Sequence, residues 1–212
     1  VISLPDLETR GPTDFDGKLT HPFTAHPKVD KKSGEMIAYG YSFQAPFVSY
    51  SVIDQHGDLV HTSPITIPRS IFMHDFAATE KYTLFLDFPI TLDVGRAIAG
   101  GPAVDFEPQY GSRIGVMPRY GLDEDVRWFD VETGVVIHTA NAWEEGDEVV
   151  TLNVERTQLK EHLQASLKFD QTWAAGSADH NPITCRKSNL LAAAWRELCT
   201  VRVDHLSKAQ AE

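Results

Sequence analysis

Residues 35–67 read EMIAYGYSFQAPFVSYSVIDQHGDLVHTSPITI and contain three short runs rich in β-branched and aromatic side chains. The runs span 34–43, 46–54 and 59–67, and polar and apolar residues roughly alternate along each of them. Glycine, proline and aspartate lie between the runs, as is typical of turns that join antiparallel strands. This stretch therefore predicts three consecutive strands and places the chain in the all-β class.

The same pattern continues toward the C-terminus. Further strands are expected at 81–92, 112–120, 126–132, 134–143 and 147–154. Residues 94–111, which are rich in glycine, are expected to form a long loop. Short antiparallel strands at this spacing are typical of β-propeller blades, each of which uses about 40–45 residues. Residues 1–155 are therefore predicted to be part of a β-propeller, about three blades.

The pattern changes after residue 155. Segments 156–170 and 188–199 place apolar residues at helical spacing. The alternation that is typical of strands does not resume. Residues 156–212 are therefore predicted to be a divergent, helix-prone C-terminal tail.

The charge and the cysteines of the chain exclude several classes of protein. Its 212 residues include 19 basic and 30 acidic side chains, and the formal net charge of −11 disfavours binding to nucleic acid and to anionic membrane surfaces. No apolar run approaches the ~20 residues of a transmembrane segment, and the first residues do not resemble a secretory signal. Cys185 and Cys199 form no CxxC pair. These features favour a cytoplasmic protein.

Three histidines lie in distinctive sequence settings: His26 in FTAHPKVD, His74 in SIFMHDFAA and His138 in VVIHTANAW. They are 48 and 64 residues apart, so they meet only in a fold whose chain returns repeatedly to one axis, as propeller blades do. Imidazole is a preferred ligand of iron, zinc and copper, so the trio predicts a metal centre. Taken singly, His26 is more simply a surface histidine, and His74 has an equal claim to be a core histidine bonded to a carbonyl.

The residues around His138 indicate how that side chain is presented. If 134–143 form a regular strand, His138 shares one face with Ala140 and Ala142, whose small side chains leave room for a cofactor or substrate. The acidic run 144–148 is expected to be a solvated turn rather than a metal site.

Four short stretches of the sequence occur in a characteristic order along the chain. They are TAHPKVD at 24–30, MHDFA at 73–77, RIGVMPR at 113–119 and NAWEEGDE at 141–148. Together they resemble the carotenoid cleavage oxygenase family, which includes carotenoid, apocarotenoid and lignostilbene dioxygenases. The resemblance covers about residues 6–150.

The resemblance implies a seven-bladed β-propeller with a non-haem iron ion, Fe(2+), which is written Fe(II) below and is held by four axial histidines. By motif, three of these ligands fall on His26, His74 and His138. The implied reaction is oxidative cleavage of a conjugated C=C double bond in a carotenoid, apocarotenoid or stilbene, which gives two carbonyl products. The implied partners are dioxygen and a small, apolar, conjugated substrate, and the full-length family allows peripheral membrane contact.

The chain departs from the family pattern, and two other functions stay open. No phrase matches the one that carries the family's fourth histidine, and the family's outer-shell glutamates are not assignable. The chain is therefore expected to be a central piece of such a protein, and a truncated, catalytically inactive fragment is the alternative function. A zinc hydrolase is the third interpretation, because three histidines and a water form a catalytic zinc set. The tail offers weaker candidates for a fourth ligand in His162, His180 and His205.

Overall fold

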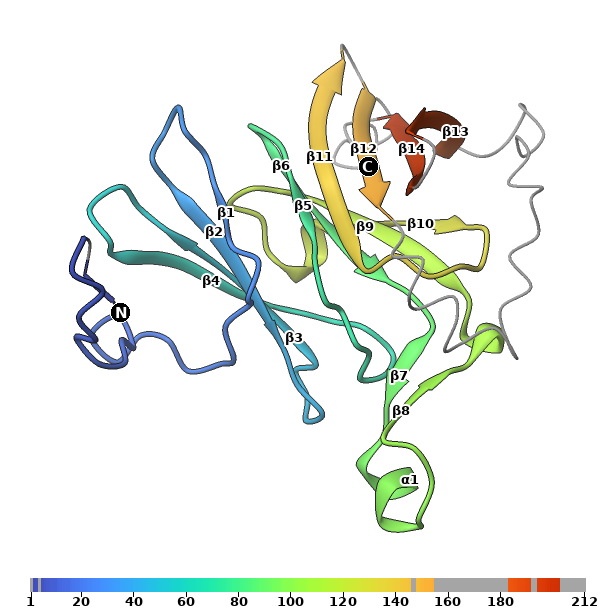
Figure 1. Ribbon diagram of the computed structural model, residues 1–212, viewed down its shortest axis with the longest axis horizontal. Coiled ribbons are helices and arrows are strands. Elements are labelled where there is room, and N and C mark those ends of the chain that lie inside the picture. The colour runs from blue at the N-terminus through green and yellow to red at the C-terminus, as the bar shows by residue number, and fades with distance from the viewer. Residues whose placement is uncertain (1, 4, 146–147, 155–182, 192–193, 203–212) are drawn as a thin grey trace.

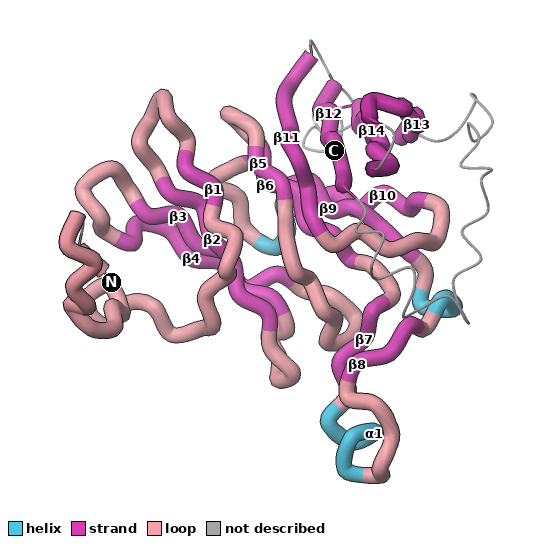
Figure 2. Tube along the Cα trace, in the orientation of Figure 1, coloured by secondary structure: helices cyan, strands magenta, loops and turns pink. Residues whose placement is uncertain are grey.

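The computed structural model describes residues 2–3, 5–145, 148–154, 183–191 and 194–202. Over this part of the chain it contains three four-stranded antiparallel sheets and one two-stranded hairpin (Figure 1). Helix is limited there to one short α-helix and two 3-10 turns, η1 Pro108–Tyr110 and η2 Asp123–Asp125 (Figure 2). The all-β class is thus confirmed. No described helix is long and apolar enough to cross a membrane.

The first sheet contains the stretch that sets the fold class. Its order is β1-β2-β3-β4, with β1 Lys28–Val29, β2 Met36–Tyr41, β3 Val48–Ile53 and β4 Leu59–Ile65. The three strands predicted in 35–67 are therefore confirmed, each with shorter ends. The register sets Tyr39 opposite Tyr50, and both side chains are buried. Cross-strand pairs of large side chains stabilise such a register.

Two further four-stranded sheets follow, of which the second keeps the sequential strand order of the first and the third has its last two strands exchanged. The second has the order β10-β9-β6-β5, with β5 Ala77–Ala78, β6 Tyr82–Asp87, β9 Ser112–Pro118 and β10 Arg127–Val131. The third has the order β11-β12-β14-β13, with β11 His138–Glu145, β12 Glu148–Val154, β14 Ala194–Arg202 and β13 Ile183–Leu191. In every sheet the strand that comes first in the sequence lies at one edge. Four-stranded antiparallel sheets are the blades of propellers, so the described chain contains three blade-like sheets.

An arm interrupts the second sheet between β6 and β9. β7 Ile90–Leu92 pairs with β8 Val104–Phe106, and α1 Val94–Ile98 lies at the tip of this hairpin (Figure 1). The Asp93 side chain caps α1 by accepting a hydrogen bond from the Arg96 amide at 2.9 Å. The prediction of a long loop over 94–111 is therefore wrong, because α1, β8 and η1 lie within it and the cap and the hairpin satisfy backbone groups that a loop leaves to solvent.

The C-terminal tail also differs from the prediction. The helix expected over 188–199 is wrong, because these residues contribute to β13 and β14. β14 pairs along its length with β12, and this pairing of the backbone overrides helical spacing in the sequence. The helix expected over 156–170 lies outside the described residues. The domain boundary at residue 155 stays a prediction, and strands from both sides of it share the third sheet.

One apolar core joins the first two sheets. Its fully buried side chains include Tyr39, Tyr50, Phe76, Phe85 and Met117. The ring centroids of Tyr39 and Phe76 lie 4.9 Å apart, and those of Tyr50 and Phe85 lie 5.8 Å apart. Full burial of such a side chain contributes about 1.5–3 kcal/mol. Since Phe76 follows His74 by two residues, this core reaches the predicted metal centre.

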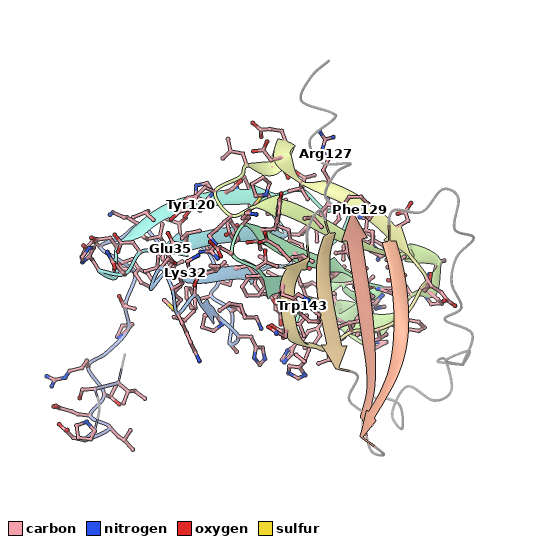
Figure 3. The ribbon with its side chains drawn as sticks, turned by 90° about the horizontal axis from the view of Figure 1, so that it is seen from above. Lys32, Glu35, Tyr120, Arg127, Phe129 and Trp143 are labelled. Carbon is pink, nitrogen blue, oxygen red and sulfur yellow. The ribbon has the colours of Figure 1, made fainter. Side chains whose placement is uncertain are left out.

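A buried arginine also links the first two sheets. Arg119 is 7% exposed, and its Nη1 lies 2.7 Å from carboxylate oxygens of both Asp30 and Glu35. The Tyr120 hydroxyl donates to Glu35, and Figure 3 labels both residues. The Lys32 amide and then Arg119 lower the pKa of Asp30, while the Tyr120 hydroxyl is the main cause of the lowered pKa of Glu35. Both carboxyl groups therefore lose their protons more readily in the folded chain than in the unfolded one.

Candidate metal centre

Each predicted ligand lies at, or just before, the edge strand of its own sheet. His26 precedes β1 by two residues, His74 precedes β5 by three, and His138 is the first residue of β11. Three edge strands thus bring together residues that are distant in the sequence. The chain therefore returns repeatedly to one region, as the spacing of the histidines predicts.

The three imidazoles form a compact cluster. Each offers one nitrogen, and these nitrogens all lie within 4.8 Å of one another. His26 Nε2 and His74 Nε2 are 2.9 Å apart. The ring centroids are 4.7 Å apart for His26 and His74, 4.8 Å for His74 and His138, and 5.0 Å for His26 and His138. All three side chains are half-buried, so their nitrogens face one another in a partly screened space.

Backbone contacts with β2 fix the segment that carries His26. The His26 amide donates to Thr24 Oγ1 at 2.9 Å, and the Thr24 amide donates to the Tyr39 carbonyl at 2.7 Å. Gly40 lies so close to Pro22 that a Cβ at position 40 would stand 1.7 Å from the Pro22 carbonyl oxygen. Only glycine permits this approach of two backbones.

Aromatic and backbone contacts fix the segment that carries His74. The Phe72 ring stacks on the His74 imidazole with centroids 5.4 Å apart and an interplanar angle of 19°. The Phe72 amide donates to the Ile90 carbonyl at 2.7 Å, and the buried Tyr39 hydroxyl donates to the Met73 carbonyl. The imidazole is therefore held beside an apolar aromatic surface.

A buried carboxylate that sequence reasoning missed follows His74. Asp75 is 3% exposed and accepts hydrogen bonds from Lys28 Nζ at 2.7 Å and from the Thr139 amide at 2.9 Å. Burial raises the pKa of Asp75, but the bonds from Lys28 and Thr139 outweigh burial and leave the pKa below its usual value. The only sequence signal for this contact is that Lys28 and Thr139 lie within two residues of His26 and His138.

Strand β11 does not keep the regular alternation that was expected around His138. The register shifts between Thr139 and Asn141, so Ala140 is an extra residue in a β-bulge. Beyond the bulge the two faces of the strand exchange, and Ala142 packs against the apolar cluster of the second sheet. The predicted common face of His138, Ala140 and Ala142 is therefore wrong.

The start of the acidic run is not a solvated turn. Glu144 lies in β11, where it accepts hydrogen bonds from Thr79 Oγ1 at 2.8 Å and from the Lys81 amide at 2.9 Å. Lys81 Nζ is 3.0 Å from the other carboxylate oxygen. Burial raises the pKa of Glu144, and the contacts with Lys81 and Thr79 outweigh burial and lower it. Glu144 therefore ties the edge strand of the third sheet to the second sheet.

The lower-ranked histidines lie in other settings. His21 Nε2 is 2.8 Å from Ser51 Oγ, and His61 Nε2 is 2.9 Å from the Gly121 carbonyl oxygen. His56 lies in an exposed turn. Among the described residues, none of these joins a group of potential metal ligands. The tail histidines at positions 162, 180 and 205 lie outside the described residues.

The donor set suits a divalent metal ion of borderline softness. Neutral imidazole nitrogens bind iron, zinc and copper, and three of them leave further coordination positions open. An apolar cluster flanks the site, since Phe72 packs with buried Ile90, Val135 and Ile137. Such a site fits an oxygen-activating iron and also a hydrolytic zinc.

Comparisons with known sequences identify relatives of this chain. The family model described as retinal pigment epithelial membrane protein, RPE65, matches residues 1–207. The carotenoid 9,10(9',10')-cleavage dioxygenase of Crocus sativus is 46% identical over 154 residues, which cover 72% of this chain and 28% of that protein. The isoeugenol monooxygenase of Pseudomonas putida is 40% identical over 148 residues, which cover 68% of this chain and 31% of that protein. The chain thus spans less than a third of the length of these relatives.

Solved structures agree with the sequence comparison. The lignostilbene dioxygenase of Pseudomonas brassicacearum matches with a TM-score of 0.67 and 37% identity, covering 72% of this chain and 33% of that one. Cobalt-substituted Synechocystis ACO matches with a TM-score of 0.57 and 28% identity, covering 70% of this chain and 33% of that one. The chain therefore belongs to the RPE65/carotenoid cleavage oxygenase family.

Proposed function

We propose that this chain supplies three histidine ligands of a non-haem Fe(II) centre in an enzyme that oxidatively cleaves a conjugated C=C double bond. The observation that carries the proposal is the convergence of His26, His74 and His138 from three separate sheets to within 4.8 Å. Because the chain spans 28% of the Crocus protein, the activity is that of a whole protein of which these sheets form a part.

The relatives support the class of substrate. Their names refer to carotenoids, isoeugenol and lignostilbene, and each of these compounds contains an alkene conjugated with a polyene or an aromatic ring. The shared feature is a conjugated C=C bond in a largely apolar molecule. The substrate we propose is therefore a carotenoid, an apocarotenoid or a stilbene, with dioxygen as the second reactant.

The residues of this chain contribute binding and orientation. A bound Fe(II) would activate dioxygen, and the alkene supplies the electrons that reduce it, because one C=C bond and one O=O bond are exchanged for two C=O bonds. His26, His74 and His138 hold the metal ion, and Phe72 keeps the His74 ring in place by stacking. The half-buried Phe72 ring offers an apolar surface beside His74, and the buried side chains of Ile90, Val135 and Ile137 pack behind it. The protein thus positions the scissile bond rather than attacking it.

One solved relative, Synechocystis ACO, is cobalt-substituted, which supports a metal-binding role for this family member. Metal content tests the proposal directly, measured on protein purified without chelators and reconstituted anaerobically with Fe(II). About one iron per chain is expected, and the His74→Ala variant should lose it while its sheets remain folded by circular dichroism. His61→Ala is a matched control, since His61 is also half-buried and bonds to a carbonyl outside the cluster.

Each outcome of the metal measurement selects one function. Iron retained by His74→Ala contradicts the ligand assignment, and stoichiometric zinc that survives anaerobic loading with Fe(II) favours the hydrolase. A folded chain that binds no metal supports the inactive fragment. In a whole protein that contains this chain and is loaded with iron, incubation with a stilbene or an apocarotenoid under labelled dioxygen should give two carbonyl products, each carrying one labelled oxygen atom.

A further inference from the structure

One buried carboxylate contacts all three segments that carry the histidines. Asp75 is joined to His74 by a peptide bond. Its Oδ1 accepts from Lys28 Nζ at 2.7 Å, and Lys28 lies two residues after His26. Its Oδ2 accepts from the amide of Thr139, which directly follows His138, at 2.9 Å.

These contacts cross between sheets that do not share strand pairing in the described part of the chain. β1, β5 and β11 belong to three different sheets, and every described ladder lies within one sheet. The spacing of the histidines therefore depends on contacts between side chains and loops at this end of the sheets. Asp75 provides the contact that all three segments have in common.

The carboxylate is held from several directions. Besides Lys28 and the Thr139 amide, the Phe76 amide donates to Oδ1 at 2.8 Å. The Thr139 hydroxyl lies 3.0 Å from Oδ2 and 2.7 Å from the Phe76 carbonyl oxygen, between which it shares its proton. A buried charge with this many donors has little freedom to move, because each lost hydrogen bond leaves a desolvated polar group.

We propose that Asp75 is a positioning residue that sets the distances among His26, His74 and His138 and thereby their affinity for a metal ion. The inference rests on the proposed function, since it assumes that the three histidines bind a metal. Asp75 is not a ligand in this arrangement, because its oxygens are used by Lys28, Phe76 and Thr139. Groups that orient metal ligands in this way typically change metal affinity about 10–100-fold when they are removed.

A charge effect must be distinguished from a positioning effect. Removing the negative charge of Asp75 weakens cation binding by electrostatics alone, so Asp75→Asn does not separate the two. Lys28→Met does, because it removes a positive charge near the site. Electrostatics alone then predicts tighter binding of a cation, whereas loss of the contact that orients the His26 segment predicts weaker binding. Lys28 is 29% exposed in its side chain, so this variant is expected to fold.

The experiment measures Co(II) affinity of the chain by titration, followed through the ligand-field absorption of the bound ion. We expect Asp75→Asn to weaken binding about 10–100-fold with altered absorption bands, and Lys28→Met to weaken it about tenfold. Asp87→Asn is the matched control, because Asp87 is also a buried carboxylate with bonds to a basic side chain, Arg113 Nε at 2.7 Å, and to the Tyr110 hydroxyl at 2.7 Å. It should lose stability and keep wild-type affinity.

The outcomes separate this inference from the function on which it rests. If the wild-type chain binds no Co(II), both proposals fail. If the wild type binds Co(II) and Lys28→Met binds it more tightly, Asp75 acts through charge and the positioning role is overturned. Equal weakening in Asp75→Asn and Asp87→Asn also overturns it, because the effect is then one of general stability. The sign observed for Lys28→Met decides the matter even if Asp75→Asn does not fold.

Discussion

Gly40→Ala perturbs the segment that carries His26 without touching an imidazole. The new Cβ would stand 1.7 Å from the Pro22 carbonyl oxygen, whereas real Cβ contacts stay above 3.0 Å. The two backbones must therefore separate by at least 1.3 Å, the difference between these two distances. Because both partners are backbone, no rotation of a side chain relieves the contact.

The size of the effect follows from the contacts that this separation breaks. Overpacking costs about 1–3 kcal/mol, and loss of the Thr24–Tyr39 backbone hydrogen bond adds about 0.5–1.5 kcal/mol. We expect the free energy of unfolding to fall by about 2–4 kcal/mol, which lowers Tm by roughly 5–15 °C in a chain of this size. Thr24 Oγ1 accepts from the His26 amide, so His26 moves with the segment and Co(II) affinity should fall about tenfold.

Urea and thermal unfolding measure the stability, and a Co(II) titration measures the affinity. Gly57→Ala is the control, because Gly57 has a φ of +90° but nothing lies within 4 Å of an added Cβ. This variant should lose about 1–2 kcal/mol through backbone strain alone and keep wild-type affinity. Unchanged stability in Gly40→Ala, or equal Co(II) affinity in the two variants, would refute the idea that contact with Pro22 positions His26.

Three other changes test the fold and the site. Arg119→Met leaves the carboxylates of Asp30 and Glu35 without their buried partner and should cost about 3–5 kcal/mol in urea unfolding at neutral pH. The pKa of each of these carboxyl groups is lowered in the folded chain, so wild-type stability is complete above the ordinary values of 3.8 and 4.5 and falls as pH drops through the lower folded values. Arg119→Met should show a shallower acid loss, and an unchanged pH profile contradicts the assignment. Tyr50→Phe removes the hydroxyl that donates to the Arg119 carbonyl at 2.7 Å, and should cost about 1–3 kcal/mol with little change in Co(II) affinity. Saturation of wild type with Fe(II) at 100 times Kd should raise the free energy of unfolding by about 2.7 kcal/mol over the chelator-treated chain, and a midpoint insensitive to chelator argues against a bound metal.

Much of the fold was predictable because its signals are local. In 35–67 the β-branched and aromatic residues and the turn residues between them locate β2, β3 and β4, although only β4 alternates between buried and exposed positions and β3 is buried on both faces. The helix expected over 188–199 failed for the opposite reason. Its apolar spacing is compatible with a helix, but β12 offers a strand edge, and that partner comes from a segment about 45 residues away.

The same distinction between local signals and distant contacts applies to the candidate metal site. The identities of His26, His74 and His138 follow from residue type and from the phrases around them. The bulge at Ala140 was not predictable, because one inserted residue is defined only by the register against β12.

By itself, the sequence determined the all-β class, the repeated strand units and the three histidines, because alternation, turn residues and ligand chemistry are properties of short segments. Only the tertiary structure decided that one carboxylate, Asp75, reaches Lys28 and Thr139, 47 and 64 residues away. Such contacts depend on how three independently paired sheets meet. No local sequence pattern predicts how the sheets pack together. Each sheet pairs its backbone hydrogen-bonding groups within itself, so the distances between sheets are set by the side chains that fill the space between them.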